Sequence, residues 1–435
     1  MDNYRSTEQM PLEQGFLYPA DMRQALRIRF FDILVFVIPA LSFLEIEMIG
    51  RLFATEIILI GLFPFLFLLK RHRLWEQMPR IFIIFCILWL FGQVTTDLIR
   101  QTPFNDWTRG WAKIVVTLIN FSTLYLLLYS NRRRIVVFLL GLAVGGILQF
   151  YFNPGIYAEG SPWKFGVGSS VTWLMILIAT CFFERIKLVS ISVLIFAVLI
   201  NLYLGFRSLA GICFLTTIFM SLQWLYGRKN TLKSKLSSKN MVLVGLAVLL
   251  AGVIFIQGYA FLAREDLLGE KAKQNYLNQA SGDFGLIFGG RSELIISGRA
   301  IMDSPIIGHG SWAKDYRYSE RLVYLKRMLG YYSGRSNELG LIPTHSHLFG
   351  AWVEAGILGA VFWVWVLFLP IRGLVLLIRK KEVLTPLFAF FAFLLIWDIL
   401  FSPFGAERRF ITPYYIIVMM SLLPLRDERT QQLRC

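Results

Sequence analysis

Residues 348–371 read LFGAWVEAGILGAVFWVWVLFLPI, a run in which Glu354 is the only charged side chain. A bilayer core needs about 20 mostly apolar residues per helix, so this run is long enough to cross a membrane. Comparable apolar runs occur along the whole chain, at residues 30–49, 52–69, 81–99, 111–130, 135–153, 166–183, 188–206, 208–226, 241–260, 383–400 and 410–425. We therefore expect an all-α integral membrane protein with about twelve transmembrane helices.

The composition excludes two other classes of protein. Of the 435 residues, 56% are hydrophobic and 17% are charged. A chain with this much apolar surface is not intrinsically disordered, and soluble globular enzymes carry roughly 25% charged residues. The formal net charge is +16, and nucleic-acid-binding proteins are also strongly basic. The position of the basic residues along the chain decides between nucleic-acid binding and membrane topology as the cause of this charge.

Lysines and arginines gather in alternate connections between the apolar runs, near residues 70–80, 132–134, 185–187, 228–239 and 379–381. Short cytoplasmic loops are enriched in these residues. A twelve-span topology puts all the clusters on one side together with both termini, so we interpret the charge as a sign of topology and expect no nucleic acid as partner.

This topology divides the chain into five segments. They are a cytoplasmic N-terminal segment at 1–29 without a cleaved signal peptide, transmembrane helices 1–9 at 30–260, one large outer loop at 261–345, transmembrane helices 10–12 at 346–425, and a cytoplasmic tail at 426–435. Helical patterns at 262–279, 291–303 and 314–329 indicate that the outer loop is ordered, and loops of this length are commonly functional.

The junction between the loop and the run that begins at residue 348 carries a distinct chemistry. Thr344 fits the N-cap position of the next helix. His345 then lies in the first turn, where the positive end of the helix dipole favours neutral imidazole and where phosphate groups bind readily. The alternative is a surface histidine without a role.

The same junction resembles a known family. His345-Ser346, nine residues, then Gly356-Ile357-Leu358-Gly359 fits the pattern H-[N/S/Q]-x9-G-x-x-G of the O-antigen ligases and related Wzy-type polysaccharide polymerases, and Glu354 matches a common family position. Two further stretches, Gly205-Phe206-Arg207-Ser208 and Gly290-Arg291-Ser292, resemble family sites that contain a basic residue. The resemblance covers roughly residues 200–370.

The resemblance implies a GT-C-like membrane glycosyltransferase in the bacterial inner membrane, with its active site facing the periplasm. The donor would be a glycan linked to an undecaprenyl-pyrophosphate-type lipid, and the acceptor another glycan or a lipid A-core. His345 would act as general base, while Arg207 and Arg291 would bind the pyrophosphate through their planar forks. Transfer would invert the anomeric configuration. The sequence has no Asp-x-Asp motif and no His/Asp cluster, so we expect no catalytic metal and no cofactor.

Further residues are candidates for supporting roles, each with a plain structural alternative. We expect Gly356 and Gly359 to allow close helix packing, and His347, which points away from His345 on a helix, to be structural or on the acceptor side. Tryptophans stack on sugars in many sites but also form interfacial belts, and arginines at span ends often snorkel. The supporting candidates are Glu354, His347, Ser346, Arg100 and Asp97, with Arg109, Trp107, Trp111 and Trp163 as possible walls of a sugar site.

Three alternatives stay open. Within the glycan class, a polymerase extends a lipid-linked repeat and a ligase transfers the chain to a lipid A-core. No residue separates the two, and we place the polymerase first, with a flippase and a chain-length regulator as partner proteins. The rival from another class is a polysaccharide or lipid flippase or transporter, and a membrane scaffold is the third reading.

Overall fold

The computed structural model describes residues 30–47, 50–129, 131–229, 238–280, 291–331, 340–379 and 382–423, and this part is about 81% helical. The predicted N-terminal segment 1–29, Gly290 and the tail 426–435 lie outside it. Its α-helices are α2 Phe30–Ala40, α3 Ala54–Lys70, α4 Gln77–Arg100, α5 Phe104–Leu128, α6 Arg132–Phe152, α7 Ile156–Gly160, α8 Gly168–Phe182, α9 Lys187–Tyr203, α10 Arg207–Lys229, α11 Ser238–Arg264, α12 Glu270–Ala280, α14 Glu293–Asp303, α15 Tyr316–Met328, α16 His347–Arg379, α17 Thr385–Phe401 and α18 Arg408–Met420.

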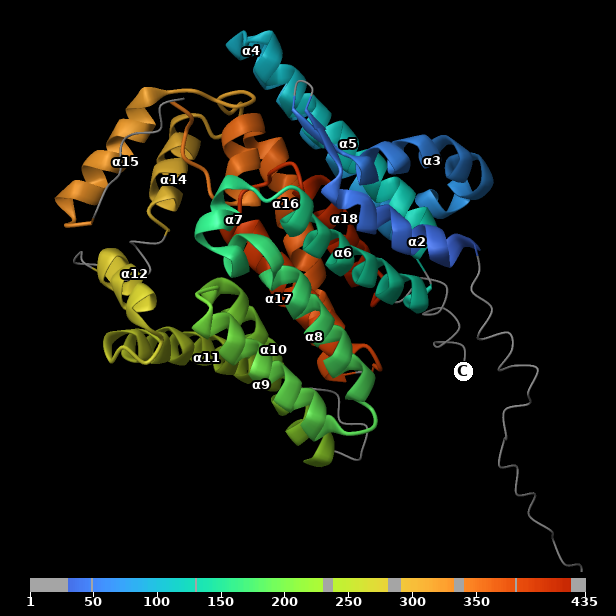
Figure 1. Ribbon diagram of the computed structural model, residues 1–435. Helices are drawn as coiled ribbons and strands as arrows, with labels where there is room; N and C mark the ends of the chain where they lie inside the picture. Colours follow the sequence, from blue (N-terminus) through green and yellow to red (C-terminus); the bar gives the residue numbers. More distant parts are fainter. Residues whose placement is uncertain are drawn as a thin grey trace, which may run out of the picture.

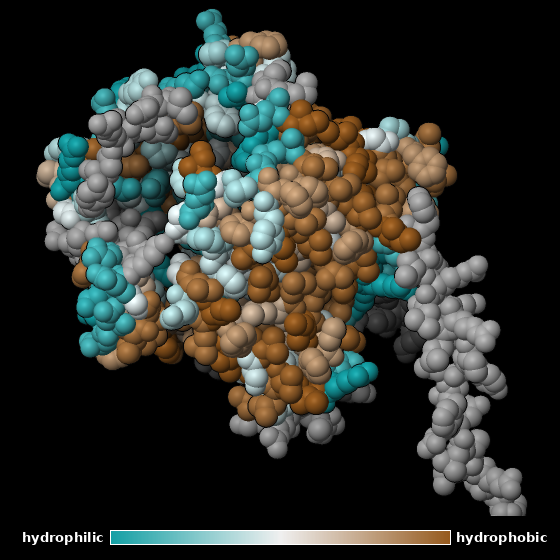
Figure 2. All heavy atoms as spheres, viewed as in Figure 1, coloured by the Kyte–Doolittle hydropathy of each residue, from teal (hydrophilic) through white to brown (hydrophobic). Residues whose placement is uncertain are grey.

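The helices form a membrane-type bundle. Six of the helical stretches are long and apolar enough to cross a membrane: Gln77–Arg100, Phe104–Leu128, Arg132–Phe152, Trp163–Phe182, Arg207–Leu225 and His347–Ile378. Hydrophobic side chains cover the face made by α2, α6, α8 and α9, whereas hydrophilic side chains gather over α12 and α15 (Figure 2). The expectation of an all-α membrane protein is confirmed at this level.

The first predicted span is shorter than expected. The sequence predicts a span at 30–49, but α2 ends at Ala40. It is followed by a 3₁₀ turn at Leu41–Phe43 and by two antiparallel strands, β1 Glu45–Glu47 and β2 Arg51–Phe53. The reason is local: Glu45-Ile46-Glu47 alternates polar and apolar residues, a pattern of period two that suits a strand. A helix of 11 residues is about 16 Å long, roughly half the hydrocarbon thickness.

Within its described residues, the predicted outer loop contains the helices α12, α14 and α15. Those expected at 291–303 and 314–329 correspond to α14 and α15. The helix expected at 262–279 is divided, because Asp266 and Gly269 adopt positive φ values of 59° and 83° between α11 and α12. A small apolar cluster that includes Ile296, Tyr318 and Val353 joins these helices to the bundle: α14 packs against α16, and α15 packs against α14 (Figure 1).

Helix α16 is interrupted at Gly356, which has φ 65° and ψ −154°. This region of backbone space is open essentially to glycine alone. The loop residues 306–310 run beside the break and take up its backbone groups: Ile357 N–H donates to Ile306 O at 3.1 Å, His309 N–H to Val353 O at 2.7 Å, and Gly310 N–H to Glu354 O at 3.1 Å. The break therefore leaves these polar groups satisfied.

Two charged side chains of α4 hold the same loop in place. Asp97 accepts hydrogen bonds from Ser311 N and Oγ, at 2.7 and 2.6 Å, and from Trp111 Nε1 and Thr102 Oγ1, both at 2.8 Å. The Arg100 guanidinium donates to Gly308 O from Nε and Nη2, at 3.1 and 2.9 Å. Hydrogen bonds with an ionised partner are among the strongest available, so α4 fixes the loop against α16.

We predict that Gly356→Ala lowers the stability of the folded protein. A Cβ at this position lies 1.9 Å from Ile306 O, and the backbone conformation alone costs a non-glycine residue about 1–3 kcal/mol. The measurement is the apparent melting temperature of the purified protein in detergent. Gly61→Ala in α3 is the control, because a Cβ there has no atom within 4 Å. Equal melting temperatures for the two variants would contradict the described role of Gly356.

Candidate functional site

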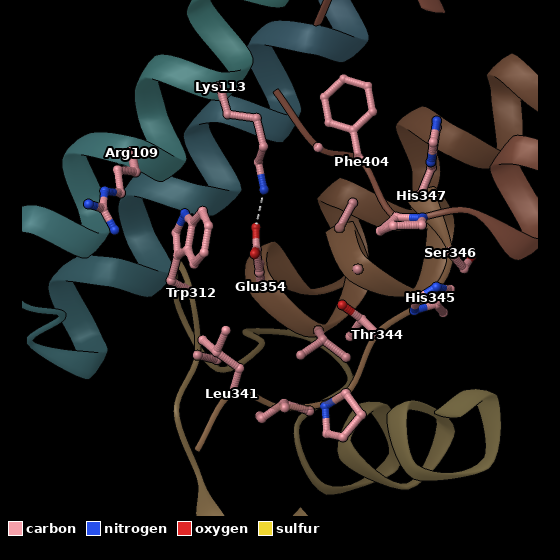
Figure 3. Close-up of a pocket in the computed structure, with 18 of the residues that line it drawn as sticks. Arg109, Lys113, Trp312, Leu341, Thr344, His345, Ser346, His347, Glu354 and Phe404 are labelled. Atoms are coloured by element: carbon pink, nitrogen blue, oxygen red, sulfur yellow. Dashed lines mark hydrogen bonds and ion pairs between the residues drawn. The ribbon is translucent and has the colours of Figure 1, made fainter. Parts of the chain in front are cut away.

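A cavity of about 1030 Å³ lies where the outer loop meets the membrane helices. One wall comes from α5, a second from residues 341–354 at the start of α16, and a third from residues 403–409 before and at the start of α18. Figure 3 shows Lys113 of α5 and Glu354 of α16 reaching toward each other across it, with Trp312 on one side of the pair and His345 on the other. The candidate general base is therefore part of a cavity wall.

The start of α16 differs from the prediction. Ser346, and not Thr344, caps the helix: its Oγ accepts a hydrogen bond from Phe349 N–H at 3.1 Å and donates to Ile399 O of α17 at 2.7 Å. The helix begins at His347, so His345 precedes it instead of lying in its first turn. The tertiary bond to α17 decides between two residues that both suit an N-cap.

His345 lines the cavity and is accessible from it, while the surrounding wall shields part of its ring from bulk water. Burial by the surrounding wall lowers the pKa of His345 below its ordinary value of 6.5, Glu293 opposes this shift, and the positive charges of Arg291, Lys326 and Lys164 support it. The imidazole is thus neutral near pH 7 and able to accept a proton, in the direction expected. The pKa of His345 is lowered by burial and by neighbouring cations, whereas the sequence predicted the helix dipole as the cause.

The two candidate pyrophosphate-binding arginines lie near His345 but do not line the large cavity: the charge of Arg291 acts on the pKa of His345, and the charge of Arg207 acts on that of Arg291. Burial lowers the pKa of Arg291, the charge of Glu293 raises it, and the charge of Arg207 lowers it. The two guanidinium groups are therefore close enough to repel each other. Each is held against aromatic rings: Arg291 lies 5.1 Å from the ring centre of Trp397, and Arg207, at the start of α10, lies 5.0 Å from that of Tyr259. A guanidinium group keeps its positive charge at neutral pH.

Lys164 is a cation of this neighbourhood that the sequence reasoning missed. It lies in the π-helical segment Trp163–Val167 before α8, where Trp163 Nε1 donates to Asn201 Oδ1 at 2.9 Å. Its charge acts on His345, and it lines a second cavity of about 480 Å³ beside Ser208 and Trp397. A lysine next to the interfacial Trp163 at the start of an apolar run was the available signal.

The supporting candidates are distributed over different parts of the molecule. Glu354 lines the cavity and forms an ion pair with Lys113, another residue that the sequence reasoning missed. His347 also lines it, but its ring is buried between Trp363 and Phe404, and Nδ1 donates to Ser402 O at 2.6 Å. Asp97 and Arg100 are engaged with the loop and do not line the cavity.

The motif glycines and the tryptophans can be placed in the same way. Gly356 allows the loop to approach α16 closely. Gly359 lies against Ala351 of its own helix, because a Cβ at residue 359 would be 2.4 Å from Ala351 O. Trp111 bonds to Asp97 and stacks on Trp107, away from the cavity. The tryptophans that line the cavity are Trp89 and Trp312, and the Arg109 guanidinium lies 5.6 Å from the Trp312 ring centre.

Two buried acidic residues of the helices, Glu56 and Asp398, are paired with arginines. Glu56 receives two hydrogen bonds from Arg409, at 2.8 and 2.7 Å, and Arg409 lines the cavity. Asp398 forms an ion pair with Arg408. Breaking such pairs is costly because it leaves an uncompensated buried charge, so these acids have structural roles. Within the described ranges, no group of three or more His, Cys, Asp and Glu residues is arranged to hold a metal ion.

Comparison with known proteins adds no assignment. Neither a protein-family model nor a curated protein matches the chain. The resemblance to the O-antigen ligases and polymerases therefore stays a prediction.

The charges around His345 predict opposite effects of two substitutions. Glu293→Gln removes a charge that raises the pKa of His345, so the pKa should fall, and Lys326→Met removes one that lowers it, so the pKa should rise. The pH dependence of His345 modification by diethyl pyrocarbonate, followed by mass spectrometry, measures both shifts.

His72 is the internal control, because it is exposed and lies on the 3₁₀ segment Arg71–Trp75 outside the cavity. Its profile should be the same in both variants. Shifts of the His345 profile in one common direction would contradict the described electrostatics.

Proposed function

We propose that the chain is a membrane glycosyltransferase of cell-surface polysaccharide assembly. The observation that carries the proposal is an accessible histidine of lowered pKa in the cavity wall, with Arg291 and Lys164 close enough to act on that pKa and Arg207 close enough to act on Arg291. A neutral histidine is suited to accept a proton, and fixed cations are suited to an anionic leaving group. The substrate class comes from the family resemblance.

In the proposed reaction His345 removes the proton from an acceptor sugar hydroxyl. The hydroxyl oxygen attacks the anomeric carbon of the donor glycan, and the bond from that carbon to the phosphate oxygen breaks. The electron pair leaves with an undecaprenyl-pyrophosphate-type group, whose negative charge Arg207 and Arg291 compensate. A single displacement of this kind inverts the anomeric configuration. No step needs a metal ion or a cofactor.

The proposal includes the topology. Each of the twelve predicted spans overlaps one helix of the structure, and the basic connections fall on one side of a twelve-span arrangement. With both termini cytoplasmic, the outer loop and its cavity face the periplasm of a bacterial inner membrane. A GT-C-like architecture, in which a membrane bundle carries its active site at the outer surface, agrees with a cavity built from helix ends and a loop.

Two acceptors fit the proposed reaction. A polymerase, which we place first, transfers the chain to another lipid-linked repeat beside a flippase and a chain-length regulator, and an O-antigen ligase transfers it to lipid A-core. A deletion strain separates them: single capped repeats indicate a lost polymerase, and bare core with lipid-linked polymer indicates a lost ligase.

One observation favours a transporter as the second candidate. Many transporters bind substrates at helices that are interrupted within the membrane, and α16 is interrupted at Gly356. In such proteins the freed backbone groups contact the ligand. Here Ile357 N–H, Val353 O and Glu354 O are occupied by the loop 306–310, which favours the enzyme.

We predict that His345→Gln slows glycan joining by roughly 10²–10⁴-fold, the usual contribution of a general base. The assay uses the purified chain in detergent with the host's own lipid-linked repeat, and glycan length is followed by gel and mass spectrometry. His72→Gln is the matched control. Joining without a closed membrane excludes the transporter, and a wild-type rate for His345→Gln would overturn the assignment of the base.

Activity should persist in EDTA, because two arginines compensate the leaving pyrophosphate. The same assay, run in excess chelator and then with added magnesium or manganese, tests this point. Loss of joining that the added metal restores would contradict a metal-independent mechanism.

A further inference from the structure

Trp312 has an unusual backbone conformation at the wall of the large cavity. Its φ is +52°, in the left-handed region that bulky residues rarely adopt. Its neighbours hold it there: Ser311 N–H and Oγ both donate to Asp97, and Ala313 O accepts a hydrogen bond from Ile342 N–H at 2.9 Å. Strain of this kind costs about 1–3 kcal/mol and gathers at functional sites.

The strained conformation does not serve to bury the side chain. Trp312 is 40% exposed and lines the cavity. Large aromatic side chains are stabilising when they are buried, so a tryptophan that is held under strain with much of its surface accessible is arranged for contact with a ligand. Figure 3 shows its ring beside the open space between α5 and the start of α16.

Polar side chains surround the ring on the α5 side. The Arg109 guanidinium lies 5.6 Å from the Trp312 ring centre, and Lys113 follows it one helical turn later, paired with Glu354. A pyranose ring has an apolar face of C–H groups, which stacks on aromatic rings, and a rim of hydroxyls, which bind to charged donors and acceptors. Both kinds of partner are present here: the Trp312 ring for the C–H face, and Arg109 with the Lys113–Glu354 pair for the hydroxyls.

We propose that Trp312, Arg109 and the Lys113–Glu354 pair form a carbohydrate subsite that holds a sugar ring of the acceptor glycan. Trp312 stacks on the ring, while Arg109, Lys113 and Glu354 bind its hydroxyls. In the view of Figure 3 the pair lies between Trp312 and His345, so a bound acceptor extends from the tryptophan toward the general base. The acceptor role rests on the proposed function, whereas sugar binding is tested without it.

The decisive variant is Trp312→Gly. Glycine adopts a φ of +52° without strain, so the folded protein should melt at the wild-type temperature or above it, while sugar binding should weaken roughly tenfold or more, as expected when an aromatic contact is lost. A tryptophan with a purely structural role would instead lower the melting temperature when removed. Trp312→Phe keeps an aromatic face and should retain most of the affinity.

The probe is the lipid-free glycan repeat released from the host's lipid-linked donor by mild acid, and binding to the full chain in detergent is measured by calorimetry. Trp75→Ala is the matched control, because Trp75 is 69% exposed and lies outside the cavity. The same titration with His345→Ala separates this proposal from the catalytic one, since binding should persist there.

Two outcomes would overturn the subsite. One is wild-type affinity in Trp312→Gly with the protein folded. The other is quenching of Trp312 fluorescence by lipids brominated on their acyl chains, which would show that the ring faces lipid instead of a sugar.

Discussion

The docking of loop residues 306–310 onto the interrupted turn of α16 is the interaction on which the rest of the structure depends. An open backbone inside a membrane bundle is tolerated only where other protein groups satisfy it, and three hydrogen bonds from this loop do so at Gly356. The hydrogen bonds of Asp97 and Arg100 then fix the loop to α4. Helix, loop and neighbouring helix therefore form one unit, and a change in any of them is transmitted to the other two.

This unit explains why the cavity has its particular chemistry. Glu354 pairs with Lys113 of α5, the segment that follows the loop places Trp312 at the cavity wall, and His345 lies at the same wall just before α16 (Figure 3). The remaining wall is fixed by the buried pair of Glu56 and Arg409. A site whose walls come from distant segments is rigid only if those segments are tied together, and backbone bonds and charge-assisted bonds provide those ties.

Much of this arrangement could be predicted from the sequence, because apolar runs and charged connections are local signals. The helices and the junction at His345 fall in this class, whereas Arg207 and Arg291 were singled out only by the family resemblance. The N-cap could not be decided, since Ser346 is selected over Thr344 by a bond to Ile399 in another helix. Lys113, Lys164 and Trp312 were missed because their importance comes from contacts with residues far along the chain. Trp312 lies two residues after the Gly308-His309-Gly310 turn, and this was the available clue.

The proposed function requires a lipid-linked pyrophosphate to bind at Arg207 and Arg291 with its glycan reaching His345. The most direct measurement is an experimental structure of the full chain in lipid nanodiscs with a non-hydrolysable analogue of the undecaprenyl-pyrophosphate glycan. We expect Arg207 and Arg291 to contact the pyrophosphate oxygens and His345 to face the anomeric carbon. A pyrophosphate bound elsewhere, with both arginines still on their aromatic partners and no sugar near His345, would contradict it.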